Sequence, residues 1–428
     1  MRWPLSDFAF GRLLQGFSLA AIGSDGRNRG AALKHSQIEN DARRAPVSDF
    51  LARAEAAASV AEKYADAVDR DARFPTEAFE ILRRERLLGM LIPSEFGGEG
   101  AQLGDAANVC AILAASCSSS GMIFAMHQVK IACLVRHHGG NPWLLQFLRD
   151  AASRQWLVAS STTEGSGGGD VRSSQAPIEG DDGRVRLKRD ASVISYGAEA
   201  DAIVTTARRS SAAADSDQVL AVFRRQDYTL EPTQTWDTLG MRGTCSIGYI
   251  LRAESDADQV LSEPYERIHA ETMAPYAHLL WSSTWQGVAS GAVRRARAFA
   301  RNVSRATGGK APPGAPHLTK ARLNLETLRG IIQAALANFD RQPAETNSMS
   351  VQLALNLLKV ETSELATATV TSAMRACGLA GYRNDSEFAI GRYLRDILSA
   401  PIMINNDRIL ANAEAGVLMT QPPVWLTS

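Results

Sequence analysis

The sequence lacks an excess of charge of either sign. Its 428 residues include 46 basic and 46 acidic side chains. Proteins that grip nucleic acid or an anionic membrane surface need a strong basic excess on one face. The composition therefore excludes both kinds of partner and favours a small-molecule ligand.

Paired cysteines and long hydrophobic runs are also missing. None of the five cysteines belongs to a CxxC pair: Cys110, Cys117, Cys133, Cys245 and Cys377. An odd, scattered set signals neither a disulfide framework nor a thiolate zinc site, and it fits a reducing, cytoplasmic compartment. No apolar run reaches the roughly 18 residues of a membrane-spanning helix, and no metal-ligand spacing is present. We therefore expect neither a membrane segment nor a metal centre.

The hydrophobic patterning divides the chain into four segments. Residues 1–40 are predicted to form a loose N-terminal arm, with a signal peptide as the alternative. Residues 41–156 carry apolar residues at helical spacing, and residues 157–263 consist of short β-like runs separated by Gly, Asp and Ser. Helical spacing returns in residues 264–428. The fold class is therefore α+β, with a helical domain, a small antiparallel β-barrel and a C-terminal helical bundle.

A glycine-rich turn follows the first β-like run. Residues 160–170 read Ser-Ser-Thr-Thr-Glu-Gly-Ser-Gly-Gly-Gly-Asp. Backbone N–H groups of such a turn can approach an anionic ligand, and its threonines can hydrogen-bond the edge of a heteroaromatic ring. Taken alone, such a Gly/Ser cluster between strands is usually only a flexible turn.

Five segments together resemble the acyl-CoA dehydrogenase family. The turn matches that family's flavin loop, Thr-Glu-Pro-Gly-Ala-Gly-Ser-Asp, at Thr163, Glu164, Gly168 and Asp170. Other family motifs are resembled, in the same order, at residues 95–100, 193–201, 239–244 and 377–396. Because the segments keep the family's order over about residues 41–420, the chain is identified as a member of this family.

The resemblance implies an architecture and a cofactor. It implies a helical N-terminal domain, a central β domain and a C-terminal four-helix bundle, in a homo-oligomer that is usually a tetramer. FAD would bind between the β domain and the bundle. Thr162, Thr163 and Ser195 would face the flavin ring, and Gly168 and Gly169 would lie near the pyrophosphate.

Other parts of the implied FAD site depart from the family's pattern or allow a second interpretation. Gly378 and Gly381 would approach FAD held by a neighbouring subunit, or would form a helix C-cap turn. Val193 stands where the family has a tryptophan. The family's Arg-x-x-Phe-Gly segment is matched only in part here. Either Arg305 or Arg301 supplies the cation for the phosphates, or these arginines lie on a solvated helix face. Flavin affinity is expected to be lower than usual.

The family's catalytic base is missing. Dehydrogenation of an acyl thioester needs a carboxylate that takes the α-proton while the β-hydride leaves to the flavin. Counted from Arg395-Asp396, the family's glutamate falls on Ile404, and the position used by a subset of the family falls near Trp281. Neither side chain can act as that base.

Two residues are candidate substitutes. Asp407 lies one helical turn beyond Ile404, although an Asp-Arg pair there is more typical of an exposed pair or cap. His127 lies on an apolar helix where the family's pocket is lined, and is either a substrate contact or a satisfied core histidine. The substrate pocket is expected to include Trp281, Met403, Ile404 and Arg242.

A flavin in this fold without the base suggests oxygenation. The family contains branches in which reduced flavin reacts with O2, and these need an apolar, water-poor pocket more than a carboxylate. The sequence therefore predicts an FAD-dependent, monooxygenase-like oxidoreductase acting on an acyl thioester or similar small organic substrate. Its partner would be a flavin reductase or an electron-transfer flavoprotein. The alternatives are α,β-dehydrogenation with a displaced base such as Asp407, and a flavin-binding subunit without chemistry.

Overall fold

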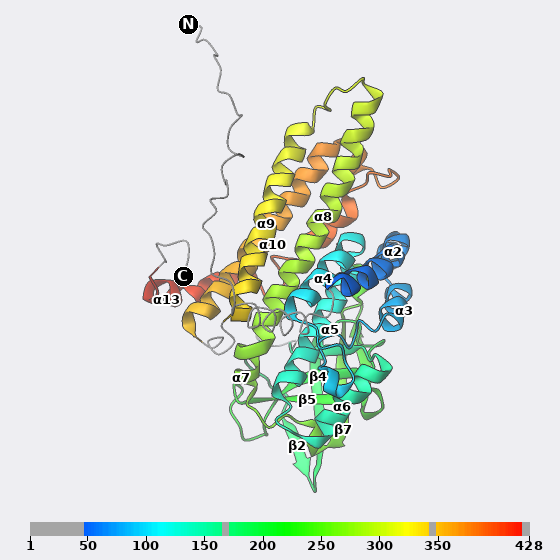
Figure 1. Ribbon diagram of the computed structural model, residues 1–428. Helices are drawn as coiled ribbons and strands as arrows, with labels where there is room; N and C mark the ends of the chain where they lie inside the picture. The colour runs from blue at the N-terminus through cyan, green and yellow to red at the C-terminus, as the bar shows by residue number, and fades with distance from the viewer. Residues whose placement is uncertain (1–46, 165–170, 342–347, 422–428) are drawn as a thin grey trace, which may run out of the picture. The chain divides into compact units, whose positions relative to one another are not determined.

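A computed structural model describes residues 47–164, 171–341 and 348–421 (Figure 1). The N-terminal arm expected over residues 1–40 lies outside this part of the chain, as do Gly168 and Gly169. Within it, helices are followed by strands and then by helices again. The predicted fold class is confirmed, whereas the exact domain boundaries stay predictions.

The first helices surround a buried central one. They are α2 (Val47–Asp71), α3 (Thr76–Arg84), α4 (Leu103–Ser116), α5 (Ser118–His137) and α6 (Pro142–Arg154). Helix α5 is buried along nearly its whole length and contacts α4, β1 and the long helix α8 (Ala274–Ala306). Because nearly every position of this helix is buried, polar ones included, no face of it is left for solvent and it lies between layers. Helix α5 is thus placed where the helical and β segments meet.

In the described part of the chain, seven strands form two sheets. They are β1 (Val158–Ser161), β2 (Ile178–Asp181), β3 (Arg184–Ile194), β4 (Ala202–Arg208), β5 (Gln218–Arg224), β6 (Tyr228–Gln234) and β7 (Ile247–Asp256). One sheet has the order β1-β4-β5 and the other β2-β3-β7-β6. All pairs are antiparallel except β1 with β4, which are joined by a long connection that contains β2 and β3. Strands β4 and β5 are buried on both faces, whereas β3 alternates between buried and exposed residues.

The C-terminal part is helical. It contains α7 (Tyr265–Ile268), a π-helical turn (His269–Met273), α8, α9 (Ala315–Arg341), α10 (Met349–Cys377), α11 (Leu379–Tyr382), α12 (Gly391–Ile397) and α13 (Asn406–Met419). Helices α8, α9 and α10 pack against one another as long rods, and α12 and α13 pack on α10 (Figure 1). No helix in the described ranges has the length and apolar character needed to cross a membrane. All five cysteines are free thiols.

Two of the family-like segments, residues 239–244 and 377–396, bind the β part of the chain to the helices. The backbone N–H of Met241 donates to the Asp396 carboxylate, with 2.7 Å between N and O. Asp396 is buried, and burial raises its pKa. The neighbouring Arg395 forms an ion pair with Asp69 of α2. These segments therefore hold three parts of the chain together.

Gly240 packs directly against the backbone of Arg395 at this junction. A Cβ atom added to Gly240 would lie 2.2 Å from the backbone oxygen of Arg395. Gly240→Ala is therefore expected to lower the free energy of unfolding by about 1–3 kcal/mol, because backbone must move to admit the methyl group. Urea unfolding measures this. The control is Gly330→Ala, at an exposed position of α9 where an added Cβ would meet nothing within 4 Å, and a gain of about 0.5–1 kcal/mol is expected. Equal effects of the two variants would contradict the tight junction.

Candidate active site

The turn after β1 is tied to β3. Thr162 and Thr163 follow the strand and are half-buried. The Ser192 hydroxyl donates to Thr163 Oγ1 at 3.0 Å, and Glu164 forms an antiparallel bridge with Ala191. Thr163, one of the two threonines predicted to face the flavin ring, is therefore tied to β3 through Ser192.

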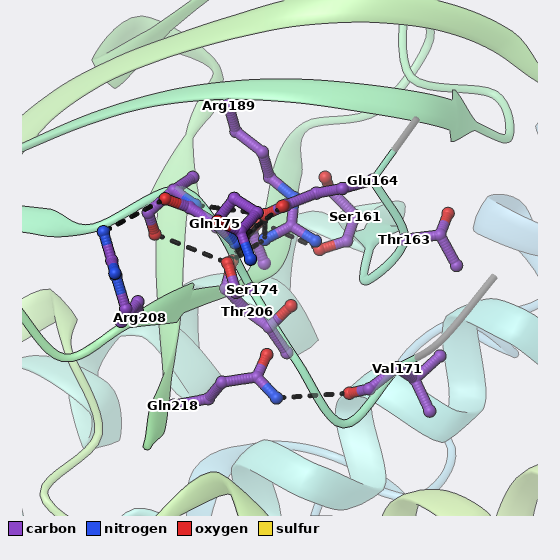
Figure 2. A network of polar contacts seen from close by, with 12 residues as sticks. Ser161, Thr163, Glu164, Val171, Ser174, Gln175, Arg189, Thr206, Arg208 and Gln218 are labelled. Carbon is purple, nitrogen blue, oxygen red and sulfur yellow. Dashed lines mark hydrogen bonds and ion pairs between the residues drawn. The ribbon is translucent and has the colours of Figure 1, made fainter. Parts of the chain in front are cut away.

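Glu164 anchors this turn through a buried ion pair. Its carboxylate lies 3.0 Å from the Arg189 guanidinium, and both side chains are nearly inaccessible. Figure 2 shows the two side chains pointing toward each other. Glu164 also accepts from the Ser174 hydroxyl and the Gln175 backbone N–H, each at 2.7 Å, while Arg189 donates to the Thr206 carbonyl. Burial lowers the pKa of Arg189 to about 10, and the charge of Glu164 opposes that shift.

A chain of hydroxyl groups ends at Ser195. Thr244 Oγ1 donates to the Met241 carbonyl at 2.8 Å, so its only proton is used. The Ser246 hydroxyl, 2.8 Å from Thr244 Oγ1, then donates to it. Ser246 in turn accepts from the Ser195 hydroxyl at 2.8 Å. This leaves the half-buried Ser195 Oγ as an acceptor, which suits an N–H group on a bound heteroaromatic ring.

Apolar side chains stand at both positions where the sequence resemblance places the family's base. Trp281 in α8 is half-buried, and its indole N–H is buried without a hydrogen-bond partner in the described part of the chain. Met403 packs against the helical core. Ile404 has φ 47° and Asn405 has φ 50°. A β-branched residue rarely adopts a left-handed backbone. Such strain is common at functional sites, so Ile404 makes this loop a candidate part of the site.

The expected substitute Asp407 is an exposed residue in the first turn of α13. Its backbone N–H donates to the capping side chain of Asn405 at 3.0 Å. Asp407 thus has the exposed position at a helix start that the sequence analysis gave as the alternative to a catalytic role. A second carboxylate, which the sequence did not suggest, belongs to Glu364. It is also exposed, and its Oε1 accepts from Asn406 Nδ2, just after the loop, at 2.9 Å.

His127 occupies the core histidine arrangement. Its Nδ1 accepts from the Val158 backbone N–H at 3.0 Å, so Nε2 carries the proton and donates to the Leu88 carbonyl at 2.8 Å. The ring is fully buried, and burial lowers its pKa to about 4. Both nitrogens are thus engaged by backbone, and the neutral ring joins α5 to β1.

Buried neutral histidines predict acid sensitivity. His278 resembles His127, because burial also lowers its pKa to about 4. The unfolded chain binds more protons than the folded one between pH 6.5 and about 4, so stability falls as the pH drops through this window. Each histidine is expected to remove about 2 kcal/mol between pH 7 and pH 5. Urea unfolding of His278→Gln, which keeps a donor for Leu355, is expected to show a flatter pH dependence than the unaltered protein, and an unchanged slope would contradict the assignment.

The remaining predicted residues do not all gather at one place. Arg242 donates to the Asp69 carbonyl at 2.8 Å and so belongs to the junction with α2. Arg305 is exposed in the last turn of α8. Gly378 has φ 56° and caps α10, as in the C-cap alternative. Gly381 is buried, and an added Cβ would lie 2.6 Å from Cys377 Cβ. Contacts and backbone geometry within this one chain thus explain why glycine stands at both positions.

One group of side chains has the composition of a metal site. Ligand atoms of His137, Glu263 and Glu271 lie within 4.8 Å of one another. Arg267 pairs with both carboxylates at 2.9 Å, and His137 Nε2 contacts Thr272 Oγ1 at 2.8 Å. The arginine already supplies the positive charge that a cation would bring, so the arrangement is that of an ion-pair network.

Three described groups are of the kinds that hold the ring of a flavin. They are the hydroxyl groups of Thr163 and Ser195, which follow β1 and β3, and the buried indole N–H of Trp281, which lacks a partner within the described residues. Such groups can hydrogen-bond the polar edge of a heteroaromatic ring, while apolar side chains cover its faces. The residues expected near the pyrophosphate, Gly168 and Gly169, lie outside the described part.

Two family models match the chain. Residues 49–155 match the model described as acyl-CoA dehydrogenase, N-terminal domain, and residues 272–412 match acyl-CoA dehydrogenase, C-terminal domain. Together they cover more than half of the chain.

Individual relatives carry out different reactions. An amino sugar nitrososynthase from Streptomyces peucetius is 25% identical over 354 residues, which are 78% of this chain and 84% of the relative. A dibenzothiophene monooxygenase from Rhodococcus erythropolis is 27% identical over 262 residues, 58% of this chain and 62% of the relative. The FMN-bound structure of TdsC from Paenibacillus sp. A11-2 has a TM-score of 0.76 at 18% identity, covering 87% of this chain and 98% of that one. At that identity the likeness shows the fold alone.

Proposed function

The chain belongs to the acyl-CoA dehydrogenase family and is a flavin-dependent oxidoreductase, and we propose that it oxygenates a small organic substrate with O2. The proposal rests on the lack of a carboxylate at Ile404 and near Trp281, the two positions where the sequence resemblance places the family's base. The named activities of the nitrososynthase and the dibenzothiophene monooxygenase support it.

The proposed reaction is a monooxygenation. When bound, the reduced flavin supplies two electrons to O2, so that one oxygen atom joins the substrate and the other leaves as water. Ser195 Oγ and the Thr163 hydroxyl hold the polar edge of the ring. Trp281, Met403 and Ile404 exclude water from the place where substrate and O2 meet, because water would waste the reducing equivalents.

The proposed cofactor is FAD, as the sequence resemblance implies. FMN is the alternative, because it is the flavin bound by the structurally similar TdsC. Fluorescence titration of flavin-free protein with each flavin separates them. Equal or tighter binding of FMN would make FMN the cofactor, and a protein that takes up neither flavin would overturn both enzymatic interpretations in favour of a subunit without chemistry.

The proposed partner is a separate NAD(P)H-flavin reductase, and an electron-transfer flavoprotein belongs to the dehydrogenase alternative. An acyl thioester or a similar small organic molecule is the proposed substrate class. We further expect a cytoplasmic homo-oligomer. Size-exclusion chromatography with light scattering checks the oligomeric state of the flavin-loaded protein.

The two reactions separate experimentally. The proposal predicts product only when reductase, NAD(P)H and O2 are all present, and no anaerobic bleaching of the oxidised flavin by acyl-CoA thioesters. Bleaching by an acyl-CoA would favour α,β-dehydrogenation instead. Its loss in Asp407→Asn or in Glu364→Gln would then identify the displaced base.

A further inference from the structure

A buried lysine lies beside the loop that replaces the family's base. Lys359 in α10 is fully buried. Its Nζ donates to the Ala400 carbonyl at 3.1 Å and to Asn406 Oδ1 at 2.6 Å, and no salt bridge to it is found among the described residues. Burial lowers its pKa to about 8, against the opposing charge of Glu364. Since a buried ammonium without a carboxylate is costly, its contacts need an explanation.

The two oxygen acceptors of Lys359 bracket the loop. Ala400 immediately precedes residues 401–405 and Asn406 immediately follows them. Between them, Ile404 and Asn405 adopt left-handed backbones. Such conformations persist only where surrounding contacts enforce them. Bonds from one ammonium to both ends of the loop are contacts of that kind.

Lys359 also contacts helix α8. Its Nζ lies 5.7 Å from the centroid of the Trp285 ring, a cation–π contact. Trp285 is fully buried in α8, one helical turn beyond Trp281 and on the same face of that helix. One side chain thus contacts both segments that carry the replaced base positions.

We propose that Lys359 is a positioning residue that holds the 401–405 loop closed against α8, so that Met403 and Ile404 form the dry wall of the pocket. The chemical consequence rests on the proposed oxygenation. Without Lys359, the loop opens and admits water, and O2 is reduced to hydrogen peroxide by the two electrons and two protons of the reduced flavin instead of oxygenating substrate.

The first measurement needs neither flavin nor substrate. In Lys359→Met, amide hydrogen exchange of Met403, Asn405 and Asn406 in the flavin-free protein is expected to speed up about tenfold or more, because two hydrogen bonds from a charged group are lost. The control is Lys130→Met, which removes another buried lysine whose pKa burial lowers to about 8 and which contacts Met273 Sδ at 3.3 Å. Exchange in the loop is expected to stay unchanged in that control.

The second measurement separates positioning from general stability. With reductase and an oxygenated substrate, Lys359→Met is expected to lower the ratio of product to hydrogen peroxide about tenfold, while Lys130→Met keeps it. If Lys359→Met fails to fold, Asn406→Ala removes one acceptor and is expected to accelerate exchange at the same amides. Unchanged exchange in both variants overturns the positioning role. If exchange is faster in the variants but the unaltered protein forms no oxygenated product, the proposed function is overturned and the positioning role stands.

Discussion

Glu164→Ala is expected to lower the free energy of unfolding by about 3–5 kcal/mol, because it leaves the Arg189 guanidinium buried without its counter-charge. The pair is separated by 3.0 Å, and the Arg189 side chain has no accessible surface. The remaining acceptors, the Thr206 carbonyl and the Ser174 hydroxyl, carry no negative charge. Urea unfolding at pH 7 measures the loss.

An exposed ion pair provides the matched control. Arg184 and Asp256 lie 2.9 Å apart with about half of each side chain exposed, so Asp256→Ala is expected to cost about 1 kcal/mol or less. The double variant Glu164→Leu/Arg189→Met is expected to be much less destabilised than Glu164→Ala, because both charges are gone. Similar losses in Glu164→Ala and Asp256→Ala would contradict the buried-pair assignment.

Ile404→Glu is expected to reduce O2-dependent product formation about 100-fold. A carboxylate at this position brings hydration and negative charge into the pocket. A 100-fold slower reaction corresponds to an activation free energy raised by about 3 kcal/mol. The rate of product formation with reductase, NAD(P)H and O2 is the measurement, and flavin binding is titrated in parallel to separate lost affinity from lost chemistry.

Ile404→Leu serves as the control for this variant. It keeps the wall apolar and removes the β-branch from a residue with φ 47°, so activity within about threefold of the unaltered protein is expected. A glutamate variant as active as the leucine variant would show that the apolar character of residue 404 is unimportant.

The order of helical and β segments could be predicted because apolar periodicity is a local property. The pairing of β1 with β4 could not, since a parallel pair depends on where the chain returns after β2 and β3. Likewise, resemblance marked Glu164 as part of the turn, yet its partner Arg189 is set by the position of β3. Long-range partners of this kind leave no local signal.

The site was predicted only in part. Neighbouring apolar residues left His127 open as a pocket or core residue, and backbone partners at Leu88 and Val158 place it in the core. Lys359 was missed because a lysine ordinarily implies exposure. A signal was present, since Lys359 falls four residues after Leu355 on the buried face of α10. A charged residue at an apolar helix position indicates that buried polar partners surround it.

The most direct test of the oxygenase account is the fate of isotopically labelled O2. Flavin-loaded protein is supplied with a flavin reductase, NAD(P)H, ¹⁸O2 and candidate acyl thioester and heteroaromatic substrates, and the products are analysed by mass spectrometry. The account predicts a product carrying one ¹⁸O atom. An unlabelled enoyl product that also forms without O2, with bleaching of the oxidised flavin, would contradict it.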